Sequence, residues 1–175
     1  MDTSPDKIAA IFCGSDAAPG DDRYKEAVAL GCALAEAGWG VLNGGYGGAM
    51  EASARGASEA GGYVIGVLLE RFGRRANRWT NDIVVANDQW ERIDMMADRV
   101  DAFVALPGGT GTLLEVAAVW EMMNKKFVAK RPLILVGEFW CPLLETFCPA
   151  PDSKAALGGL LKLVERAQDV PAALG

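Results

Sequence analysis

"AFVALPGGTGTLLEVAAVW", residues 102–120, joins a short apolar run to a second apolar segment through a turn that contains three glycines. A continuous apolar run bounded by turn signals is typical of a strand buried on both faces of a parallel sheet, so we predict a strand over 102–107. We predict that residues 112–126, after the turn, form a helix. A strand, a turn and a helix in this order form the repeating unit of an α/β sheet.

The same unit recurs along the chain. Short apolar runs predict further strands at 7–13, 40–43, 63–69 and 82–86, and a last strand at 132–137. Helices are predicted at 24–37, after the glycine turn at 44–48, and at 89–99, and the C-terminal third is expected to form helix pieces broken by Pro142, Pro149 and Pro151. Alternating strands and helices indicate right-handed βαβ units. We therefore predict a Rossmann-like α/β three-layer sandwich with a mostly parallel sheet, in a single nucleotide-binding domain of residues 1–175.

Composition narrows the possible chemistry. The chain has no histidine, which removes His-ligated metals, Ser-His-Asp hydrolysis and imidazole acid–base catalysis. A net charge of −6 argues against a nucleic-acid surface. The four cysteines have no C-x-x-C spacing and are expected to be buried or half-buried thiols in a reducing compartment. No apolar stretch approaches the ~20 residues of a membrane span, and the N-terminus is unlike a signal peptide. We expect a cytoplasmic protein with small-molecule partners, no nucleic-acid or membrane partner, no metal and no cofactor.

Two glycine-rich turns follow predicted strands and precede predicted helices. In an open parallel sheet, ligands bind beyond the carboxyl ends of the strands. Glycine lets backbone N–H groups approach an oxyanion, and the helix N-terminus adds partial positive charge. Each turn is thus a candidate phosphate site, although glycines are also common in tight turns without a ligand. The candidate residues are Gly44, Gly45, Gly47, Gly48, Met50, Gly108, Gly109, Gly111, Thr110 and Thr112.

Known phosphate fingerprints do not match these turns. The chain has no G-x-x-x-x-G-K-[ST] motif, which argues against a P-loop NTPase. The first strand is followed by "CGSD" and not by the dinucleotide pattern G-x-G-x-x-G, and Met50 occupies the third glycine position of "GYGGAM". A mononucleotide therefore fits better than NAD.

Two charged residues each have a structural and a functional interpretation. Thr112 and Glu115 match the S/T-x-x-E capping box, in which the carboxylate would only satisfy the helix start. Arg92 lies in the predicted helix at 89–99, where a surface arginine could pair with Glu91 or Asp94. The functional alternative is that both serve catalysis.

Two further features also have two interpretations. Four arginines, Arg71, Arg74, Arg75 and Arg78, lie in one loop on the predicted ligand edge. They either gather an anionic substrate or form a solvated loop. The predicted helix at 112–126 is apolar nearly all round, which indicates either a homodimer interface or a deep core position.

Several motifs together resemble one family. "PGGTGTLLE" (107–115) is similar to the PGG-x-GT-x-x-E signature of the LOG ("lonely guy") proteins, which are cytokinin riboside 5′-monophosphate phosphoribohydrolases formerly described as lysine decarboxylases. "FCGS" (12–15), which holds Gly14 and Ser15, "GGYGGAMEA" (44–52) and Arg92 in "ERIDMM" (91–96) support the resemblance. It spans about residues 9–136.

The resemblance implies a function and roles for individual residues. The implied reaction is hydrolysis of the N-glycosidic bond of a nucleoside 5′-monophosphate by Arg92 and Glu115, with the phosphate on residues 108–112 and a homodimeric assembly. The family usually has M-x-x-R-K-x-x-M around the arginine, whereas this chain has Gln89, Ile93 and Met96. Gln89 and Met96 are accordingly predicted in the base pocket, and AMP or a related purine monophosphate is the expected substrate.

The main alternative is a non-catalytic nucleotide or molybdenum-cofactor carrier on the same fold, in which Glu115 only caps a helix. Lysine decarboxylation is rejected because it needs pyridoxal phosphate on a Schiff-base lysine. None of the lysines follows a glycine turn or a strand end in a way that suits that role.

Overall fold

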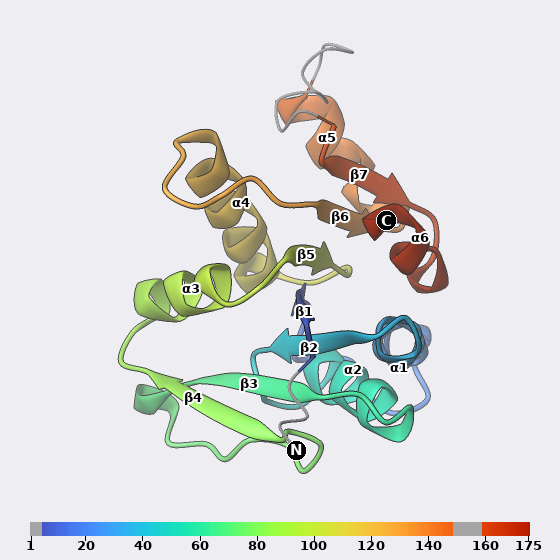
Figure 1. The fold of residues 1–175 in the computed structure, drawn as a ribbon, viewed down its shortest axis with the longest axis vertical. Helices are drawn as coiled ribbons and strands as arrows, with labels where there is room; N and C mark the ends of the chain where they lie inside the picture. Colours follow the sequence, from blue (N-terminus) through green and yellow to red (C-terminus); the bar gives the residue numbers. More distant parts are fainter. Residues whose placement is uncertain (1–4, 149–158) are drawn as a thin grey trace.

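A parallel sheet flanked by helices on both faces makes up most of the computed structural model, which describes residues 5–148 and 159–175 (Figure 1). The strands are β1 (Lys7–Phe12), β2 (Trp39–Asn43), β3 (Val64–Leu69), β4 (Asp82–Ala86), β5 (Ala102–Ala105), β6 (Leu133–Val136) and β7 (Leu161–Val164). The helices are α1 (Asp22–Glu36), α2 (Ala49–Glu59), α3 (Gln89–Asp98), α4 (Thr110–Asn124), α5 (Cys141–Phe147) and α6 (Val170–Leu174), with short 3₁₀ turns η1 (Glu70–Phe72), η2 (Glu138–Trp140) and η4 (Ala167–Asp169).

The strand order is β4-β3-β2-β1-β5-β6-β7, and every pair of neighbouring strands is parallel. From β1 the chain moves outward through β2 and β3 to β4, then returns to β5 on the other side of β1. The order therefore reverses between β1 and β5. In open α/β sheets, ligands bind outside the carboxyl ends of the strands at this switch point.

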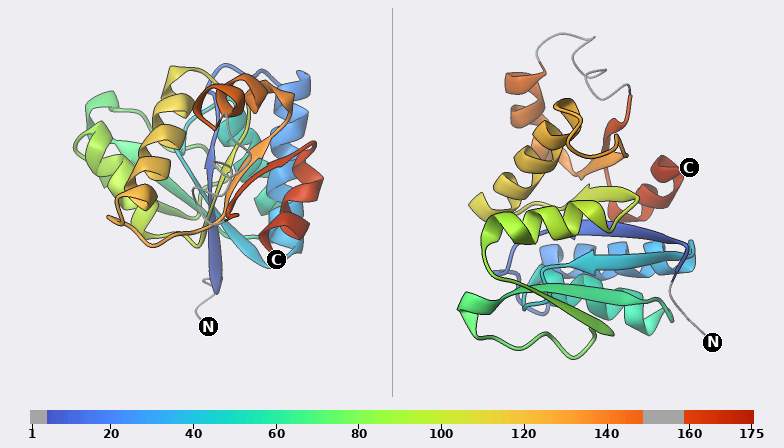
Figure 2. Two further views of the ribbon diagram at one scale, coloured as in Figure 1. Left: turned by 90° about the horizontal axis from the view of Figure 1, so that it is seen from above. Right: turned by 60° about the vertical axis from the view of Figure 1, so that its left-hand side comes forward.

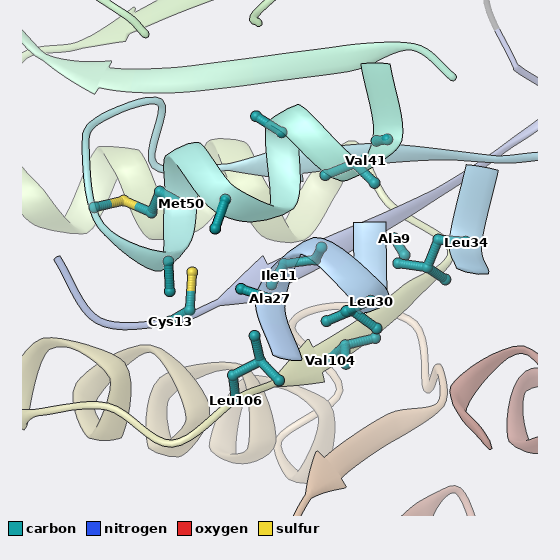
Figure 3. Packing of buried hydrophobic residues seen from close by; sticks show 14 of the residues in the cluster. Ala9, Ile11, Cys13, Ala27, Leu30, Leu34, Val41, Met50, Val104 and Leu106 are labelled. Carbon is teal, nitrogen blue, oxygen red and sulfur yellow. The ribbon is translucent and has the colours of Figure 1, made fainter. Parts of the chain in front are cut away.

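The helices divide into two layers, which confirms the Rossmann-like three-layer sandwich. Residues of α1, α2 and α6 form one hydrophobic cluster with one face of the sheet, and residues of α3, α4 and α5 form a second cluster with the other face. The views in Figure 2 show α1 and α2 on one side of the sheet and α3 and α4 on the other. Figure 3 shows Leu30 and Leu34 of α1 beside Ala9 and Ile11 of β1 in the first cluster.

Two glycines allow α1 and α2 to pack closely. A Cβ at Gly31 of α1 would collide with the carbonyl oxygen of Ser53, and one at Gly56 of α2 would collide with that of Val28. Only glycine permits this distance between the two helices at the contact, so Gly31 and Gly56 have a packing role. The contact fixes α2, and with it the glycine turn that precedes α2.

The sheet extends further than the sequence predicted. The strand at 132–137 is not the last, because β7 pairs with β6 in the register Leu133↔Leu161. Periodicity missed β7 because it has only four residues at the sheet edge, and of its apolar side chains only Leu161 is buried, whereas Leu163 is 43% exposed. Pro142 lies in the first turn of α5, where proline is tolerated; Pro149 and Pro151 fall outside the described residues.

The predicted thiol environments are confirmed, since Cys13 and Cys148 are buried and Cys32 and Cys141 half-buried, all without a disulfide. No helix in the described part of the chain combines the length and apolar character of a membrane span.

Candidate active site

Helix α4 starts earlier than the capping-box pattern predicted. Its N-cap is Gly109, which has an extended backbone, and no side chain caps the helix. Thr112 is already the third helical residue, so the predicted capping box of Thr112 and Glu115 is wrong. The chain turns tightly into α4 at Gly108, where a Cβ would collide with the Thr112 hydroxyl. The early start leaves the N–H groups of residues 110–112 without an intrahelical acceptor, as at any helix N-terminus.

Glu115 is instead part of a buried ion pair. Its side chain is 10% exposed, and its Oε1 lies 3.6 Å from Nη1 of Arg92, which is 8% exposed. Arg92 Nε also donates a hydrogen bond of 2.8 Å to the carbonyl oxygen of Val67 in β3. The alternative of a surface arginine paired with Glu91 or Asp94 is therefore wrong. The Glu91 carboxylate accepts hydrogen bonds from Asn87 instead.

Local structure holds Arg92 in place. The Asp88 carboxylate caps α3 by accepting from the N–H groups of Trp90 and Glu91 at 2.8 and 3.0 Å. Such a cap fixes the first turn of a helix, and Arg92 follows directly. The Arg92 guanidinium also lies 5.8 Å from the ring centre of Tyr46, whose hydroxyl accepts a hydrogen bond of 2.7 Å from the Leu69 N–H.

Burial changes the acidity of this site. It raises the pKa of Glu115 from 4.5 to about 7, although the Arg92 guanidinium acts in the opposite direction. A carboxyl group with a pKa near neutrality can both accept and return a proton at physiological pH. Burial and the nearby Glu115 also raise the pKa of the Cys13 thiol, which argues against a nucleophilic thiolate.

The pair lies in a cleft of about 420 Å³ at the switch point between β1 and β5. Most of the predicted residues meet there: the cleft is lined by Gly14, Ser15, Gly44, Met50, Gln89, Arg92, Gly109, Thr110, Gly111, Thr112 and Glu115. The turn after β1 and the turn before α2 are joined by a hydrogen bond of 3.0 Å from the Ala49 N–H to the Gly14 carbonyl. Three loops that are distant in sequence therefore form one site.

Some lining residues were not singled out from the sequence. They are Ile11, Cys13, Asp16, Tyr46, Phe72 and Leu114. The position of Tyr46 between the glycines of "GGYGG" was a usable signal, because an aromatic side chain in such a turn has to pack close to the site. Phe72 carried no signal, because η1 brings it over the cleft from within a polar loop. Arg74 of the arginine-rich loop also lines the cleft, which favours the interpretation that this loop gathers an anionic substrate.

Four predicted glycines do not line this cleft. Gly45 and Gly48 adopt positive φ angles of 74° and 70° and pack against Gly66 and the backbone of Ser15, respectively. They shape the turn, as Gly108 shapes the next one. Gly47 faces a neighbouring cavity.

The predicted base-pocket role of Met96 is wrong. Met96 is 1% exposed and Ile93 is 2% exposed, and both belong to the hydrophobic cluster under α3. Met96 lies seven residues after Gln89, about 10 Å further along the helix axis and away from the cleft. Gln89, at the start of α3, does reach the cleft.

The cleft combines three chemical elements. Free N–H groups at the start of α4 suit an anion, Glu115 can transfer a proton, and Arg92 supplies a fixed positive charge. Within the described ranges, no group of three or more His, Cys, Asp or Glu residues is placed to hold a metal ion.

The fold and cleft define the class: a Rossmann-like α/β protein with a buried arginine–carboxylate pair and a glycine-rich helix start at its switch point. The chain belongs to the SLOG cluster4 family, whose sequence profile matches residues 7–138.

Curated relatives agree with the family assignment. The chain is 36% identical to the cytokinin riboside 5′-monophosphate phosphoribohydrolase of Mycobacterium tuberculosis, over 69% of this chain and 65% of the relative. It is 32% identical to the protein of the same name from Rhodococcoides fascians, over 79% of this chain and 72% of the relative. The chain thus spans just under two thirds of the mycobacterial relative. These names support a hydrolase at the level of the family.

Solved structures include a second kind of relative. The molybdenum cofactor carrier protein of Chlamydomonas reinhardtii is 28% identical with a TM-score of 0.73, over 97% of this chain and 95% of that one. The molybdenum cofactor binding protein of Rippkaea orientalis is 27% identical with a TM-score of 0.71, over 93% of this chain and 91% of that one.

Proposed function

We propose that this protein hydrolyses the N-glycosidic bond of a purine nucleoside 5′-monophosphate such as AMP and releases the free base and ribose 5-phosphate. The observation that carries the proposal is the buried pair of Arg92 and Glu115, in one cleft with the free N–H groups at the start of α4. The names of the curated relatives support the same reaction.

The 5′-phosphate is assigned to residues 109–112. The N–H groups at the start of α4 and the partial positive charge of the helix terminus favour a bound dianion there. The exposed Thr110 adds a hydroxyl donor on the cleft wall. Anchoring the phosphate at this point holds the ribose near Glu115, which is one helical turn further along α4.

Glu115 is assigned to the reacting centre. Departure of the base leaves positive charge on the sugar, as in other glycoside hydrolyses, and a nearby carboxylate stabilises it. As water attacks C1′, its proton passes to Glu115, the C1′–N bond breaks, and the electron pair leaves with the base, which takes up a proton. A pKa near 7 leaves a large ionised fraction to start this step at neutral pH.

Arg92 is assigned to the ionisation of Glu115. Its guanidinium lowers a pKa that burial alone would raise further, and so keeps the carboxylate available. The hydrogen bond to Val67 holds the guanidinium in this position. Contact with the ribose or with the departing base is a further role that the position of Arg92 in the cleft allows.

The functional unit is proposed to be a homodimer. Helix α4 is buried on one side only, which removes the deep-core alternative, and Leu113 on its outer side is 44% exposed. Leu113 and Ala117 line an apolar groove of about 460 Å³ together with Phe147 of α5, which is 70% exposed. A second copy would cover this surface. Location in the cytoplasm and the lack of a nucleic-acid partner stay predictions.

A carrier of a phosphorylated ligand is the second candidate. The observation that favours it is the coverage of the molybdenum cofactor carrier structures, which match nearly the whole chain. In that case the same cleft binds its ligand without breaking a bond.

Turnover distinguishes the two functions. Purified protein is incubated separately with AMP and with isopentenyladenosine 5′-monophosphate, and free base is followed by chromatography. Release of adenine supports the hydrolase, and the ratio of the two rates reports the preferred base. Tight binding of nucleotide or molybdenum cofactor with no release of either base would replace the hydrolase by the carrier.

A further inference from the structure

The arginine-rich loop after β3 lines a second cavity beside the cleft. This cavity has a volume of about 380 Å³, and three of the four loop arginines line it together with four other residues: Arg74, Arg75, Arg78, Tyr46, Gly47, Glu51 and Asn77. Tyr46 and Arg74 also line the first cleft. The two spaces therefore share a wall.

The cavity carries uncompensated positive charge. In the described part of the chain, Arg74, Arg75 and Arg78 form no ion pair, and the one stacking partner is the ring of Trp79 at 4.6 Å from the Arg78 guanidinium carbon. Glu51 is the only carboxylate that lines the cavity, which leaves an excess of two positive charges. In a chain with a net charge of −6, such a concentration of unpaired arginines favours an anionic ligand.

Hydrogen bonds fix the loop that presents the arginines. The Asn77 N–H donates to the Gly45 carbonyl at 2.8 Å, and the Asn77 side-chain amide donates to the carbonyls of Gly45 and Tyr46 at 3.2 and 3.1 Å. The Asn77 side-chain oxygen in turn accepts from the Trp79 N–H. These contacts hold the loop against the glycine turn at Asn77. They thereby fix the backbone on which Arg75 and Arg78 lie, on either side of Asn77.

The backbone of the cavity is also accessible. A Cβ built at Gly47 meets no atom within 4 Å, so the peptide at this position faces open space. A phosphate oxygen can approach such a backbone closely, and several guanidinium groups around it can each donate charge-assisted hydrogen bonds.

We propose that this cavity is a second anion subsite that binds a phosphate group, separate from the phosphate position at the start of α4. The inference rests on the proposed function for the position of the nucleotide in the first cleft. The phosphate has two possible sources: a second phosphate on the nucleotide itself, or a separate phosphate anion bound beside it.

Binding measurements separate these sources. All titrations use isothermal calorimetry in a Glu115→Gln background, so that hydrolysis does not interfere. The ligands are AMP, ADP, adenosine 3′,5′-bisphosphate and inorganic pyrophosphate, the last with and without saturating AMP. The test variant is Arg75→Gln/Arg78→Gln, which removes two positive charges. The control is Arg71→Gln, which removes one positive charge from the same loop at a residue that lines neither space.

The subsite predicts a selective loss of affinity. In the double variant, binding of a ligand that fills the cavity weakens by roughly tenfold or more, because each lost arginine contact is charge-assisted. AMP affinity stays within about twofold of that of the parent, because the single phosphate of AMP does not contact the cavity and solvent screens the more distant charges. Loss for ADP or the bisphosphate identifies the nucleotide as the source, and loss for pyrophosphate alone identifies a separate anion.

The proposal is overturned if the double variant and Arg71→Gln weaken binding equally, if no ligand with a second phosphate loses affinity, or if AMP loses as much as the others. These readouts are independent of turnover. Failure to release base from AMP would reject the proposed reaction while the pyrophosphate titration still tested the cavity.

Discussion

Replacement of Glu115 by glutamine is predicted to change how the stability of the protein depends on pH. The folded state raises the pKa of Glu115 from 4.5 to about 7 through burial. Below 4.5 the carboxyl group is protonated in both the folded and unfolded states. Between 4.5 and 7 the folded state keeps a proton that the unfolded state has lost, so the free energy of unfolding falls as the pH rises. Above 7 the contribution is constant.

The size of the effect follows from this difference. At about 1.4 kcal/mol for each pH unit over which only the unfolded state has lost the proton, the total loss is about 3 kcal/mol, and most of it falls between pH 5 and pH 8. Glu115→Gln removes this dependence because glutamine does not ionise. The variant should therefore gain stability relative to the wild type as the pH rises, whatever its stability at pH 5.

Urea unfolding at several pH values between 5 and 8 measures the effect. The matched control is Glu121→Gln on the same helix, where the carboxylate is 60% exposed and pairs with Lys125. The control should follow the wild-type pH dependence. Parallel curves for wild type and Glu115→Gln would refute the argument that burial of Glu115 raises its pKa.

Two further variants test the surroundings of the pair. Arg92→Gln removes the guanidinium that opposes the effect of burial, so the pKa of Glu115 should rise above 7 in a carbon-13 NMR titration of its side chain; an unchanged or lower value would contradict the assigned role of Arg92. Gly48→Ala places a Cβ against the backbone of Ser15 at a positive φ, so urea unfolding should show a loss of about 2 kcal/mol. Gly47→Ala, in open space, is the control, and an equal loss in both variants would disprove the packing argument.

The sequence predicted the fold well because local signals were strong. Short apolar runs followed by glycine turns placed β2 and β5, and the alternation of strands and helices predicted that both turns face one edge of a parallel sheet. The four residues of β7 could not be recognised, because so short a run, with only one buried side chain, does not establish a period. Its strand conformation is recognised from its parallel pairing with β6.

The site was predicted only in part, for reasons of geometry. The pattern T-x-x-E supports a capping box, but Gly109 starts the helix earlier and leaves Glu115 free to face Arg92. Their contact joins two helices and cannot be derived from either segment alone. Helical spacing likewise places Gln89 and Met96 on one face without showing which end of α3 reaches the cleft.

The most direct test of the account is the rate of adenine release from AMP by the wild type, Glu115→Gln and Glu121→Gln. We predict that wild type and Glu121→Gln release adenine at the same rate, with one ribose 5-phosphate for each adenine. Glu115→Gln should stay folded and lose roughly 10²- to 10⁴-fold in kcat, the usual contribution of a positioned acid–base group. Wild-type rates in the Glu115→Gln variant would show that this carboxylate does not carry the reaction.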